Sequence, residues 1–552
     1  MSSPYASRPW LKHYDYWIRP HMTYPTRPLY EILSTTATDM PDGQATQFLG
    51  AALTYREIKQ RTDGLAKALL RLGVRQGDRV GIMLPNCPQY IIAAFAILRL
   101  GAVVVNINPI YTARELQNVA TDSGAKVLIT LDRLASLSLE IRATSDIAQV
   151  IVTSLSEYSS EAAPPPAVAG ALSLAELIGA DDGRDLPLVK IGPDDLAVLQ
   201  YTGGTTGTPR AAMLTHGNIF ANVVQTETWH YRQYHRGEGR YLLVIPYFHI
   251  YAFTVGMMCG VWVGGLQILV PKYDVEQVLA AIRDFKPTYF PAVPTVFVSL
   301  LAHPQIRDYG LDAVRAFNSG GAPCPVEVME EFETRIGRPL NQGYGLSETS
   351  PVTHSTPHLA ERKYASIGLP LPDTDMKIVD VETGTREMPL GEAGELCISG
   401  PQVMKGYWNR PEESADALRR DEQGRIWFHT GDVATMDEDG YTFIVQRKKD
   451  MIIVDGFNVY PSEVEGVLYT HAGVRMVAVI GVPDSYHGEV VKACVVPRDA
   501  NVSIDELKAH CKRNLAAYKV PAEIELRDSL PQSAVGKILY RVLRDEVAAR
   551  HS

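Results

Sequence analysis

Short apolar segments alternate with amphipathic helical patterns along the first part of the chain. Each apolar segment has the length of a buried strand, and four of them are Arg79–Pro85, Ala102–Pro109, Lys126–Leu131 and Gln149–Ser154. Strands that alternate with helices at this spacing are typical of parallel sheets covered by helices on both faces. A second alternating block runs from Asp195 to about Gly345. The sequence therefore predicts an α/β fold with doubly wound, mixed sheets.

The character of the sequence changes twice after these blocks. From Gly368 to Ile444, short strand-like segments lie between Gly, Asp and Pro turns, which predicts a β-rich subdomain at about residues 368–445. Beyond Gln446, about a hundred residues carry the mixed helix and strand patterns of a small α+β domain. A chain of 552 residues is too long for a single core. We therefore predict a large N-terminal domain over residues 1–446 and a C-terminal domain over residues 447–552.

Charge and cysteine usage narrow the function classes. Sixty-three acidic residues against 53 basic ones give a net charge of −10, so a nucleic-acid-binding surface is not indicated. The six cysteines are scattered without a CxxC pair or metal-ligand spacing, and the N-terminus lacks an apolar signal core. These features favour a reduced, cytoplasmic protein without a nucleic-acid partner.

One apolar segment has the length of a membrane span. Tyr251–Val270 contains no charged residue, but Gly264 and Gly265 divide it into a helix-length piece and a short strand-like run. We therefore expect a buried helix followed by a strand.

The segment Tyr201–Arg210 combines three glycines with four threonines directly after a predicted strand. Glycines let backbone amides approach a ligand closely, and consecutive amides with hydroxyls around them suit a polyphosphate. An ordinary Gly/Thr surface loop would have the same composition. The segment is neither a Walker loop nor a GxGxxG fingerprint.

Five further segments carry residues suited to chemistry. Each alone is more often structural, since an Asp after Thr-Gly is usually a turn residue and a Lys/Arg cluster is usually a solvated face. The segments are Ser319–Pro325, Gln342–Pro351, Trp427–Ala434 (which is expected to present Asp432 in a turn), Arg447–Asp450 and Ser533–Arg541.

Together these motifs resemble the adenylate-forming superfamily of acyl-CoA synthetases, peptide-synthetase adenylation domains and beetle luciferases. YTGGTTG, FHIYAF, SGGAP, GYGLSET, GELCISGPQVMKGYW, FHTGD, RKKDMII, GFNVYP and VGKIL occur in the order and spacing of that family, over nearly the whole chain. Within the family, PQVMKGYW, DMII–GFNVYPSEVE and YKVP are most similar to bacterial medium- or long-chain fatty acid–CoA ligases.

The resemblance implies a reaction in two steps. ATP activates a fatty acid as an acyl-adenylate and pyrophosphate leaves; the thiol of coenzyme A then displaces AMP. Bringing an anionic carboxylate against an anionic phosphate makes charge neutralisation and positioning the main catalytic tasks. ATP, Mg²⁺ and coenzyme A are the implied cofactors, and the C-terminal domain is implied to be a mobile lid with its hinge near Lys449.

The resemblance also implies a role for each motif residue around ATP. Ser347 would contact the α-phosphate, and Glu348 would bind Mg²⁺ together with Thr202. Tyr344, between Gly343 and Gly345, would stack on adenine, and Asp432 would accept the ribose hydroxyls beside Arg447. The pocket wall would be formed by Gly320, Gly321 and Ala322. The β- and γ-phosphates would be held by Thr202, Gly203, Gly204, Thr205, Thr206, Gly207, Thr208 and Arg210.

Four more positions are assigned by the resemblance. Lys537 would bridge the carboxylate and the α-phosphate as a point cation. His249 would lie beside the acyl carboxylate, although a hydrogen-bonded core histidine is the alternative. Phe253 stands where some long-chain relatives have an aromatic gate, and Gly456 matches the glycine that approaches the pantetheine thiol.

The sequence departs from the family pattern at several positions. The usual phosphate-loop ending PKGA is PRAA here, so Arg210 replaces a lysine and Ala211 a glycine. Gln446, Asp455 and Tyr540 also replace customary residues, and all three belong to the thioester-forming half of the cycle.

Three alternative functions stay open at this point. The chain could be a ligase that loads a carrier protein, an aryl- or short-chain acid–CoA ligase, or a non-catalytic acyl- or nucleotide-binding relative. Because fatty acids partition into bilayers and relatives often dimerise, the resemblance also allows a peripheral membrane contact and a homodimer.

Overall fold

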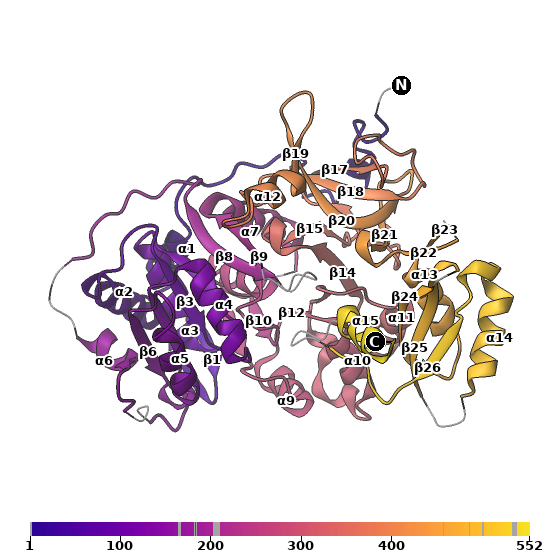
Figure 1. Cartoon of the computed structure of the whole chain (residues 1–552). Helices are drawn as coiled ribbons and strands as arrows, with labels where there is room; N and C mark the ends of the chain where they lie inside the picture. The colour runs from indigo at the N-terminus through magenta and orange to yellow at the C-terminus, as the bar shows by residue number, and fades with distance from the viewer. Residues whose placement is uncertain are drawn as a thin grey trace. The chain divides into compact units, whose positions relative to one another are not determined.

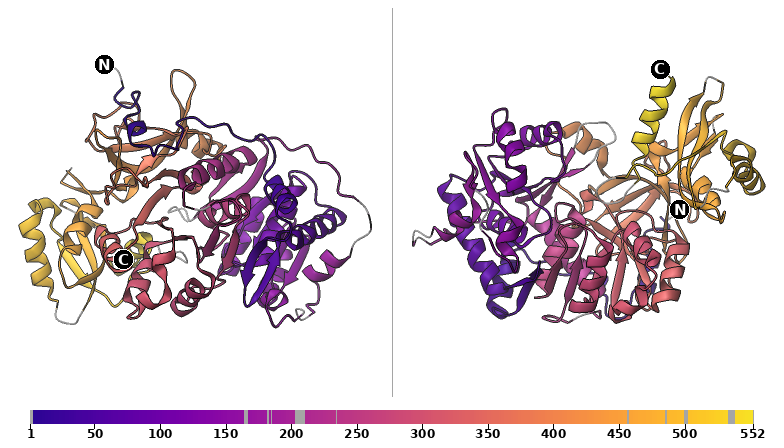
Figure 2. Two further views of the ribbon diagram at one scale, coloured as in Figure 1. Left: turned by 180° about the vertical axis from the view of Figure 1, so that it is seen from behind. Right: turned by 90° about the horizontal axis from the view of Figure 1, so that it is seen from below.

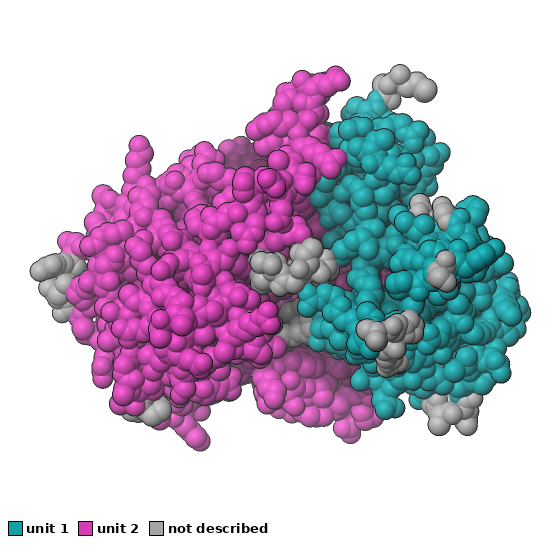
Figure 3. All heavy atoms as spheres, in the orientation of Figure 1, with its two compact units in different colours: residues 1–12, 376–398, 429–552 teal, residues 13–375, 399–428 magenta. Residues whose placement is uncertain are grey.

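The computed structural model describes residues 3–551 except 164–166, 181–182, 184, 203–209, 234, 456, 485, 499–501 and 533–537 (Figure 1). Contacts within the chain group it into two compact units, coloured separately in Figure 3. One unit contains His13–Asp375 and Ser399–Phe428; the other contains Met1–Lys12, Met376–Ile398 and His429–Ser552. The domain boundary between residues 446 and 447 stays a prediction.

The first sheet of the larger unit has seven strands in the order β7-β6-β5-β3-β4-β8-β9. The strands from β7 to β8 run parallel, and β8 and β9 form an antiparallel pair at one edge. The four strands predicted in the first part of the chain are present as β3, β4, β5 and β6. The bounds are β3 (Arg79–Met83), β4 (Val103–Asn106), β5 (Val127–Leu131), β6 (Gln149–Thr153), β7 (Leu172–Ser173), β8 (Leu196–Thr202) and β9 (Arg210–Thr215).

Alternate strand residues of this sheet enter two different hydrophobic cores. Ile82, Val104 and Ile129 belong to the core that contains α2 (Tyr55–Arg71) and α3 (Pro88–Arg99). Their neighbours along the strands, such as Val105 and Leu128, belong to the core that contains α4 (Ala113–Ser123) and α5 (Ala135–Arg142). Because successive side chains of a strand point to opposite faces, the two cores lie on opposite faces of the sheet. The doubly wound arrangement is confirmed, and Figures 1 and 2 show these helices around the sheet.

The second sheet has nine strands in the order β16-β15-β14-β13-β12-β10-β11-β1-β2. The strands from β14 to β1 are parallel, whereas β15, β16 and β2 pair antiparallel at the two edges. The bounds are β1 (Gln44–Phe48), β2 (Ala51–Thr54), β10 (Arg240–Leu243), β11 (Leu266–Leu269), β12 (Tyr289–Ala292), β13 (Ala316–Ser319), β14 (Leu340–Gly345), β15 (Val352–Ser355) and β16 (Leu369–Pro370).

The described part of His13–Asp375 contains seven further α-helices, one of which has a clear start signal in the sequence. The helix α9 begins after Asp274, whose side chain accepts a hydrogen bond from the Gln277 amide, an N-cap that satisfies a backbone donor. The bounds are α1 (Tyr30–Asp39), α6 (Leu174–Gly179), α7 (His216–His230), α8 (Cys259–Trp262), α9 (Val275–Phe285), α10 (Pro294–Ala302) and α11 (Val326–Ile336).

The uncharged segment Tyr251–Val270 is a helix followed by a strand, as predicted. It contains a π-helical stretch, Ala252–Met258, then α8, a turn at Gly264 and Gly265, and β11. Among the described residues, no helix has the length and apolar composition needed to cross a membrane.

A five-stranded sheet corresponds to the predicted β-rich region. Its order is β17-β18-β20-β19, with β21 paired to β20. The bounds are β17 (Asp375–Val379), β18 (Gly394–Ser399), α12 (Pro411–Ala417), β19 (Leu418–Arg420), β20 (Ile426–Met436) and β21 (Thr442–Arg447).

The C-terminal part forms an α+β fold, as predicted. Its sheet has the order β23-β22-β25-β24, with β26 beside β25. One core joins the sheet to α13 and α14, and a second core joins alternate residues of β24 and β25 to α15. The bounds are β22 (Ile452–Val454), β23 (Phe457–Val459), α13 (Pro461–Tyr469), β24 (Val474–Asp484), β25 (Gly488–Pro497), α14 (Ile504–Asn514), β26 (Glu523–Leu526) and α15 (Tyr540–His551).

Candidate active site

The Gly/Thr segment connects the antiparallel strands β8 and β9. Thr202 ends β8, Arg210 begins β9, and the two residues face each other in register. The Thr202 hydroxyl donates to the Arg210 carbonyl oxygen at 3.3 Å, which closes the base of the hairpin. The residues between them, to which the phosphate contacts were assigned (Gly203, Gly204, Thr205, Thr206, Gly207 and Thr208), lie outside the described residues.

Arg210, the departure from the family pattern, contacts two side chains of the segment around α12. Its Nε lies 2.6 Å from the Glu413 carboxylate. Its guanidinium carbon lies 5.7 Å from the centre of the Tyr407 ring, which is within the range of a cation–π contact. The arginine therefore ties the start of β9 to residues far downstream in the sequence.

Tyr407 links this arginine to the predicted magnesium ligand. Its hydroxyl donates to Glu348 Oε1 at 2.9 Å. Burial raises the pKa of Tyr407, and the negative charge of Glu348 raises it further, so the phenol keeps its proton and remains a donor. Glu348 follows Ser347 in a single turn, Ser347–Thr349, directly after β14, and its carbonyl accepts from the Met404 amide at 2.8 Å. Ser347 and Glu348 therefore lie together, as predicted.

The backbone around Tyr407 also pairs with β9. The Trp408 amide donates to the Ala211 carbonyl, and the Lys405 amide donates to the Met213 carbonyl, both at 2.9 Å. The segment 405–408 thus adds to the edge of β9 that does not pair with β8.

The other flank of the Gly/Thr segment is held through Asp122. The Tyr201 hydroxyl donates to Asp122 Oδ2 at 2.7 Å, and Arg410 donates to Oδ1 at 3.1 Å. The Trp408 indole donates to the Asp122 carbonyl at 3.0 Å. Arg210 therefore contacts residues 405–413 directly, and Tyr201 is linked to the same stretch through Asp122.

The predicted adenine contacts lie at the carboxyl end of β14. Tyr344 is half-buried and contacts His354 of β15 edge to face, with 5.9 Å between ring centres. A Cβ atom on Gly345 would lie 2.0 Å from the Pro351 carbonyl oxygen, so the close approach of two backbones requires glycine there. A Cβ atom on Gly343 would meet nothing closer than 3.8 Å.

The predicted pocket wall Gly320, Gly321 and Ala322 follows the carboxyl end of the neighbouring strand β13. A Cβ atom on Gly320 would lie 3.0 Å from the Tyr251 ring. Gln342 of β14 accepts from the Cys324 amide at 3.0 Å and so fixes this turn against Tyr344's strand. Gly320–Ala322 and Tyr344 therefore lie at the same edge of the sheet.

His249 precedes the π-helical stretch that carries Phe253. Its Nδ1 lies 3.2 Å from the Tyr251 amide, and its side chain is half-buried. Phe253 is fully buried. A π-helical stretch is often found at a functional site. The acyl-carboxylate role of His249 and the gate role of Phe253 stay predictions.

Asp432 and Arg447, in the smaller unit, form an ion pair across two strands. Asp432 of β20 faces Arg447 of β21 in register, and Arg447 Nε lies 2.8 Å from Asp432 Oδ1. The expectation that Asp432 lies in a turn is wrong, because Asp432 lies inside β20. The turn-like sequence is accommodated within the strand by Gly431 at φ 69° and a register shift after Val433.

Beside this pair, Lys448, next to the predicted hinge position, forms an ion pair with Glu395. Burial alone would raise the pKa of Glu395, but hydrogen bonds from His429 and Lys448 outweigh it and lower the pKa to about 2. Lys448 lies 3.1 Å from Glu395. Burial lowers the pKa of the next residue, Lys449, the predicted hinge position.

The remaining departures have identifiable contacts in the C-terminal fold. Asp455 has φ 51°, a left-handed conformation that glycine adopts most easily and aspartate tolerates, and it pairs with His487 at 2.7 Å. Tyr540 donates to Glu465 at 3.0 Å. Gln446 donates to the Arg447 carbonyl at 3.0 Å. Gly456 and Lys537 lie outside the described residues.

Sequence reasoning missed four residues of the larger unit that support the predicted site. Glu413, Tyr407 and Gln342 were inside or beside quoted motifs but had no assigned role, and Asp122 lies in no motif. A carboxylate or tyrosine next to a motif is too common a signal to single out. Only the long-range contacts identify them.

The family relationship follows from comparisons with known proteins. The AMP-binding enzyme family matches residues 33–408, and the C-terminal domain of AMP-binding enzymes matches residues 463–537. The chain therefore belongs to the AMP-binding enzyme family, and the resemblance predicted from the motifs is confirmed.

Individual relatives agree with this assignment. A long-chain-fatty-acid–CoA ligase of Bacillus subtilis is 41% identical over 99% of both chains. A feruloyl-CoA synthase of Amycolatopsis is 40% identical, over 91% of this chain and 96% of that one. The crystal structure of ATP-bound MatB from Rhodopseudomonas palustris has a TM-score of 0.86 at 28% identity, covering 96% of this chain and 100% of the other. The predicted fold class is thereby confirmed.

Proposed function

We propose that this chain is a fatty acid–CoA ligase that forms AMP, acting through an acyl-adenylate and transferring the acyl group to coenzyme A. One observation carries the proposal: 41% identity to a long-chain-fatty-acid–CoA ligase over nearly the full length of both chains. ATP, Mg²⁺ and coenzyme A are the cofactors of this reaction, and ATP is bound in the structurally similar MatB.

Glu348 and Thr202 would hold Mg²⁺. Among the described residues, no group of three or more His, Cys, Asp and Glu is placed to bind a metal ion. The single carboxylate of Glu348 fits Mg²⁺, which is usually bound by one or two carboxylates together with substrate phosphates and water. Tyr407 would orient the Glu348 carboxylate through its hydrogen bond to Oε1. When bound, Mg²⁺ supplies charge neutralisation to the phosphates.

The nucleotide contacts are proposed residue by residue. Tyr344 would stack on adenine against the turn Gly320–Ala322, and Ser347 would donate to the α-phosphate. Asp432 would accept the ribose hydroxyls, held in place by its ion pair with Arg447. The carboxylate of the acid would lie beside His249, and Lys537 would neutralise charge between it and the α-phosphate.

Two classes of acid are candidates for the substrate of this enzyme, a long-chain fatty acid and an aryl acid. The 40% identity to a feruloyl-CoA synthase favours an aryl acid as the alternative substrate. Incubation with ATP, Mg²⁺, coenzyme A and acids of two to eighteen carbons, with benzoate- and coumarate-type acids, decides between them. We expect the highest kcat/KM with a long-chain acid. If no acid yields AMP or acyl-CoA, the enzymatic proposal fails and a non-catalytic binding role takes its place.

The acceptor and the cellular setting complete the proposal. AMP release that does not require coenzyme A would favour a carrier protein as the acceptor. We place the enzyme in the cytoplasm, with a C-terminal lid that turns about Lys449. A fatty-acid substrate is consistent with a peripheral membrane contact, which vesicle flotation tests. Relatives often dimerise, and light scattering tests whether this protein forms a homodimer.

A further inference from the structure

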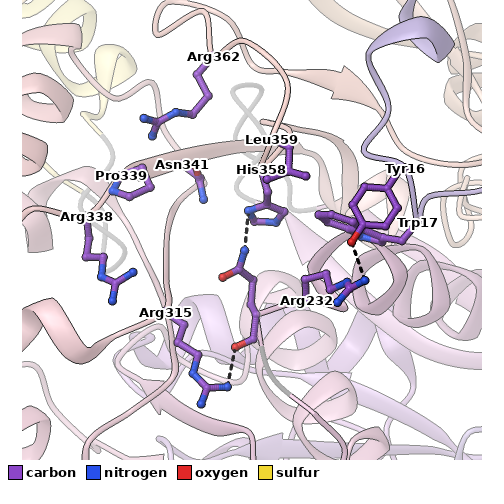
Figure 4. A pocket seen from close by; sticks show the side chains of 11 residues that line it. Tyr16, Trp17, Arg232, Arg315, Arg338, Pro339, Asn341, His358, Leu359 and Arg362 are labelled. Carbon is purple, nitrogen blue, oxygen red and sulfur yellow. Dashed lines mark hydrogen bonds between the residues drawn. The ribbon is translucent and has the colours of Figure 1, made fainter.

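A pocket of about 350 Å³ opens in the larger unit at the amino ends of β13 and β14 (Figure 4). The predicted nucleotide contacts follow the carboxyl ends of the same two strands. Gly320 lies five positions after Arg315. At about 3.3 Å per residue along a strand, this places the pocket roughly 17 Å from the nucleotide contacts. The pocket is therefore not part of the proposed active site.

Four arginines line this pocket: Arg232, Arg315, Arg338 and Arg362. They come from four separate places in the chain, after α7, before β13, before β14 and after β15. No aspartate or glutamate is among the described residues that line it. Guanidinium groups gathered at one place create a positive potential that attracts an anion.

Three of these arginines donate hydrogen bonds to neutral groups. Arg232 donates to the Tyr16 hydroxyl at 2.6 Å, Arg315 to the Gln233 carbonyl at 3.4 Å and Arg338 to the Asp312 carbonyl at 2.7 Å. Each contact engages one nitrogen of a group that has five N–H donors. Arg362 differs, because its Nη2 pairs with Glu333 at 2.8 Å.

Three residues that line the pocket each have a buried polar atom for which the described part of the chain offers no hydrogen-bond partner. These atoms are the indole nitrogen of Trp17, Nη1 of Arg362 and Oδ1 of Asn341. The Asn341 residue is only 3% exposed. Unpartnered buried polar atoms are rare in folded proteins, and each costs about 1–3 kcal/mol. All three atoms belong to residues that line the basic pocket.

The histidine on the pocket wall does not contribute the positive charge. The two ring nitrogens of His358 lie 3.0 Å from Gln233 and 3.1 Å from His230. Burial lowers the pKa of His358 to about 4, with Asp15 opposing and Arg362 adding to the effect. Burial also lowers the pKa of His230. The charge available to a ligand at neutral pH is therefore that of the guanidinium groups.

We propose that this pocket binds a small anion with two adjoining phosphate groups. Planar guanidinium forks match phosphate oxygens in bidentate fashion. Three arginines that have no carboxylate partner among the described residues suit a ligand of two to four negative charges. A diphosphate supplies several oxygens, enough to accept from more than one guanidinium group at once. Free pyrophosphate, ADP and coenzyme A all carry this group.

Calorimetric titration of the full-length protein with pyrophosphate, ADP and coenzyme A, without Mg²⁺, tests the proposal. We expect the double variant Arg315→Gln/Arg338→Gln to raise the Kd of at least one of these probes tenfold or more. Arg232→Gln, which removes a third guanidinium group from the pocket, is expected to raise the same Kd severalfold. Which probe binds most tightly identifies the source of the diphosphate.

Matched controls separate the pocket from the nucleotide site. Arg133→Gln removes an exposed arginine elsewhere and should leave each Kd within twofold. The KM for ATP and the thermal midpoint of the double variant should match those of the unmodified protein. Equal affinity in both proteins for all three probes would overturn the proposal. Loss of binding to phosphatidylglycerol vesicles, with no binding of the soluble probes to the unmodified protein, would overturn it as well.

Discussion

Arg210 shows how neighbouring side chains accommodate a single replacement in a motif. The guanidinium reaches Glu413 with Nε and lies over the Tyr407 ring, two contacts that a planar, forked group makes better than a point charge. Both contacts are with the segment that pairs with β9, so the arginine holds the end of the Gly/Thr segment as well as carrying its charge.

The first prediction concerns this arginine. An ion pair with both partners about one-third exposed is worth up to about 1 kcal/mol, and the ring contact about 0.5–1 kcal/mol. Arg210→Ala should therefore lower kcat/KM for ATP roughly tenfold, and Arg210→Lys roughly threefold, measured by pyrophosphate release. An Arg210→Lys variant with higher activity than the unmodified protein would contradict the positioning role.

The second prediction concerns Tyr407. Tyr407→Phe removes the hydroxyl that donates to Glu348 and leaves the ring under Arg210. Loss of a group that orients a metal ligand typically weakens metal binding 10–100-fold, so the Mg²⁺ concentration for half-maximal activity should rise about tenfold. Tyr364→Phe is the matched control, since it removes a similar tyrosine hydrogen bond to Glu333. An unchanged Mg²⁺ requirement in Tyr407→Phe would separate Tyr407 from the metal site.

At the scale of single residues, the sequence predicted which residues belong to the candidate site better than it predicted their contacts. Ser347 and Glu348 lie together after β14, and Asp432 and Arg447 pair, as their order in the motifs indicated. The contacts of Tyr407 and Glu413 could not be predicted, because they join residues about 60 and 200 positions apart in sequence, to Glu348 and Arg210. Asp432 was misplaced in a turn because Thr-Gly-Asp is a turn sequence, and pairing with β21 overrides that local preference.

Among the elements, β14 and β15 provide the sharpest steric test. Gly345→Ala would place Cβ 2.0 Å from the Pro351 carbonyl oxygen and force the two strands apart. Overpacking of this kind costs about 1–3 kcal/mol. We expect a lower thermal midpoint and loss of adenylation, because the shift moves Tyr344 and Glu348. Gly343→Ala, two residues away with 3.8 Å of clearance, should leave the thermal midpoint within error. Equal midpoints for the two variants would contradict the assigned contact.

A second element-level prediction concerns Glu465 of α13. Burial raises its pKa to about 7, although donors from Val479 and Tyr540 oppose the shift. The folded state therefore keeps a proton that the unfolded state loses at about pH 4.5, so stability falls as the pH rises from 4.5 to 7. At about 1.4 kcal/mol per pKa unit, the loss is up to about 3 kcal/mol.

Urea unfolding at pH 5 and pH 8 measures this effect. Glu465→Gln mimics the protonated carboxyl and should reduce the loss of stability between the two pH values. Glu463→Gln, an exposed carboxylate of the same helix that pairs with Lys519, serves as the control and should leave the loss unchanged. The assigned pKa is wrong if Glu465→Gln and the unmodified protein lose stability equally.

The elements themselves were largely predictable, for a physical reason. Apolar runs such as Val127–Leu131 are buried on both faces, so their length and composition identify parallel strands. Capping boxes at Thr54 and Thr112 mark the starts of α2 and α4. The π-helical stretch Ala252–Met258 could not be predicted, because its composition does not distinguish it from an α-helix.

For the whole molecule, the sequence identifies the type of reaction more firmly than it identifies the acid that serves as substrate. The nucleotide motifs are short and ordered along the chain, whereas the depth of an acyl pocket is a three-dimensional property of many apolar residues. The relatives reflect this, since proteins named for a long-chain fatty acid and for feruloyl-CoA synthesis are about equally similar to this chain.

The last prediction tests whether the two half-reactions use different residues of the C-terminal domain. Lys537 is assigned to adenylation, where a point cation offsets charge between carboxylate and α-phosphate. Lys537→Ala should lower the rate of adenylate formation at least a hundredfold, measured by pyrophosphate release, because electrostatic stabilisation of this kind is usually worth about 3 kcal/mol or more. Attack of coenzyme A on acyl-adenylate supplied from outside should remain within about threefold. Lys449→Pro, at the predicted hinge, is the complementary variant: it should impair thioester formation more than adenylation. Equal loss of both steps in Lys537→Ala would mean that one arrangement of the domain serves the whole reaction.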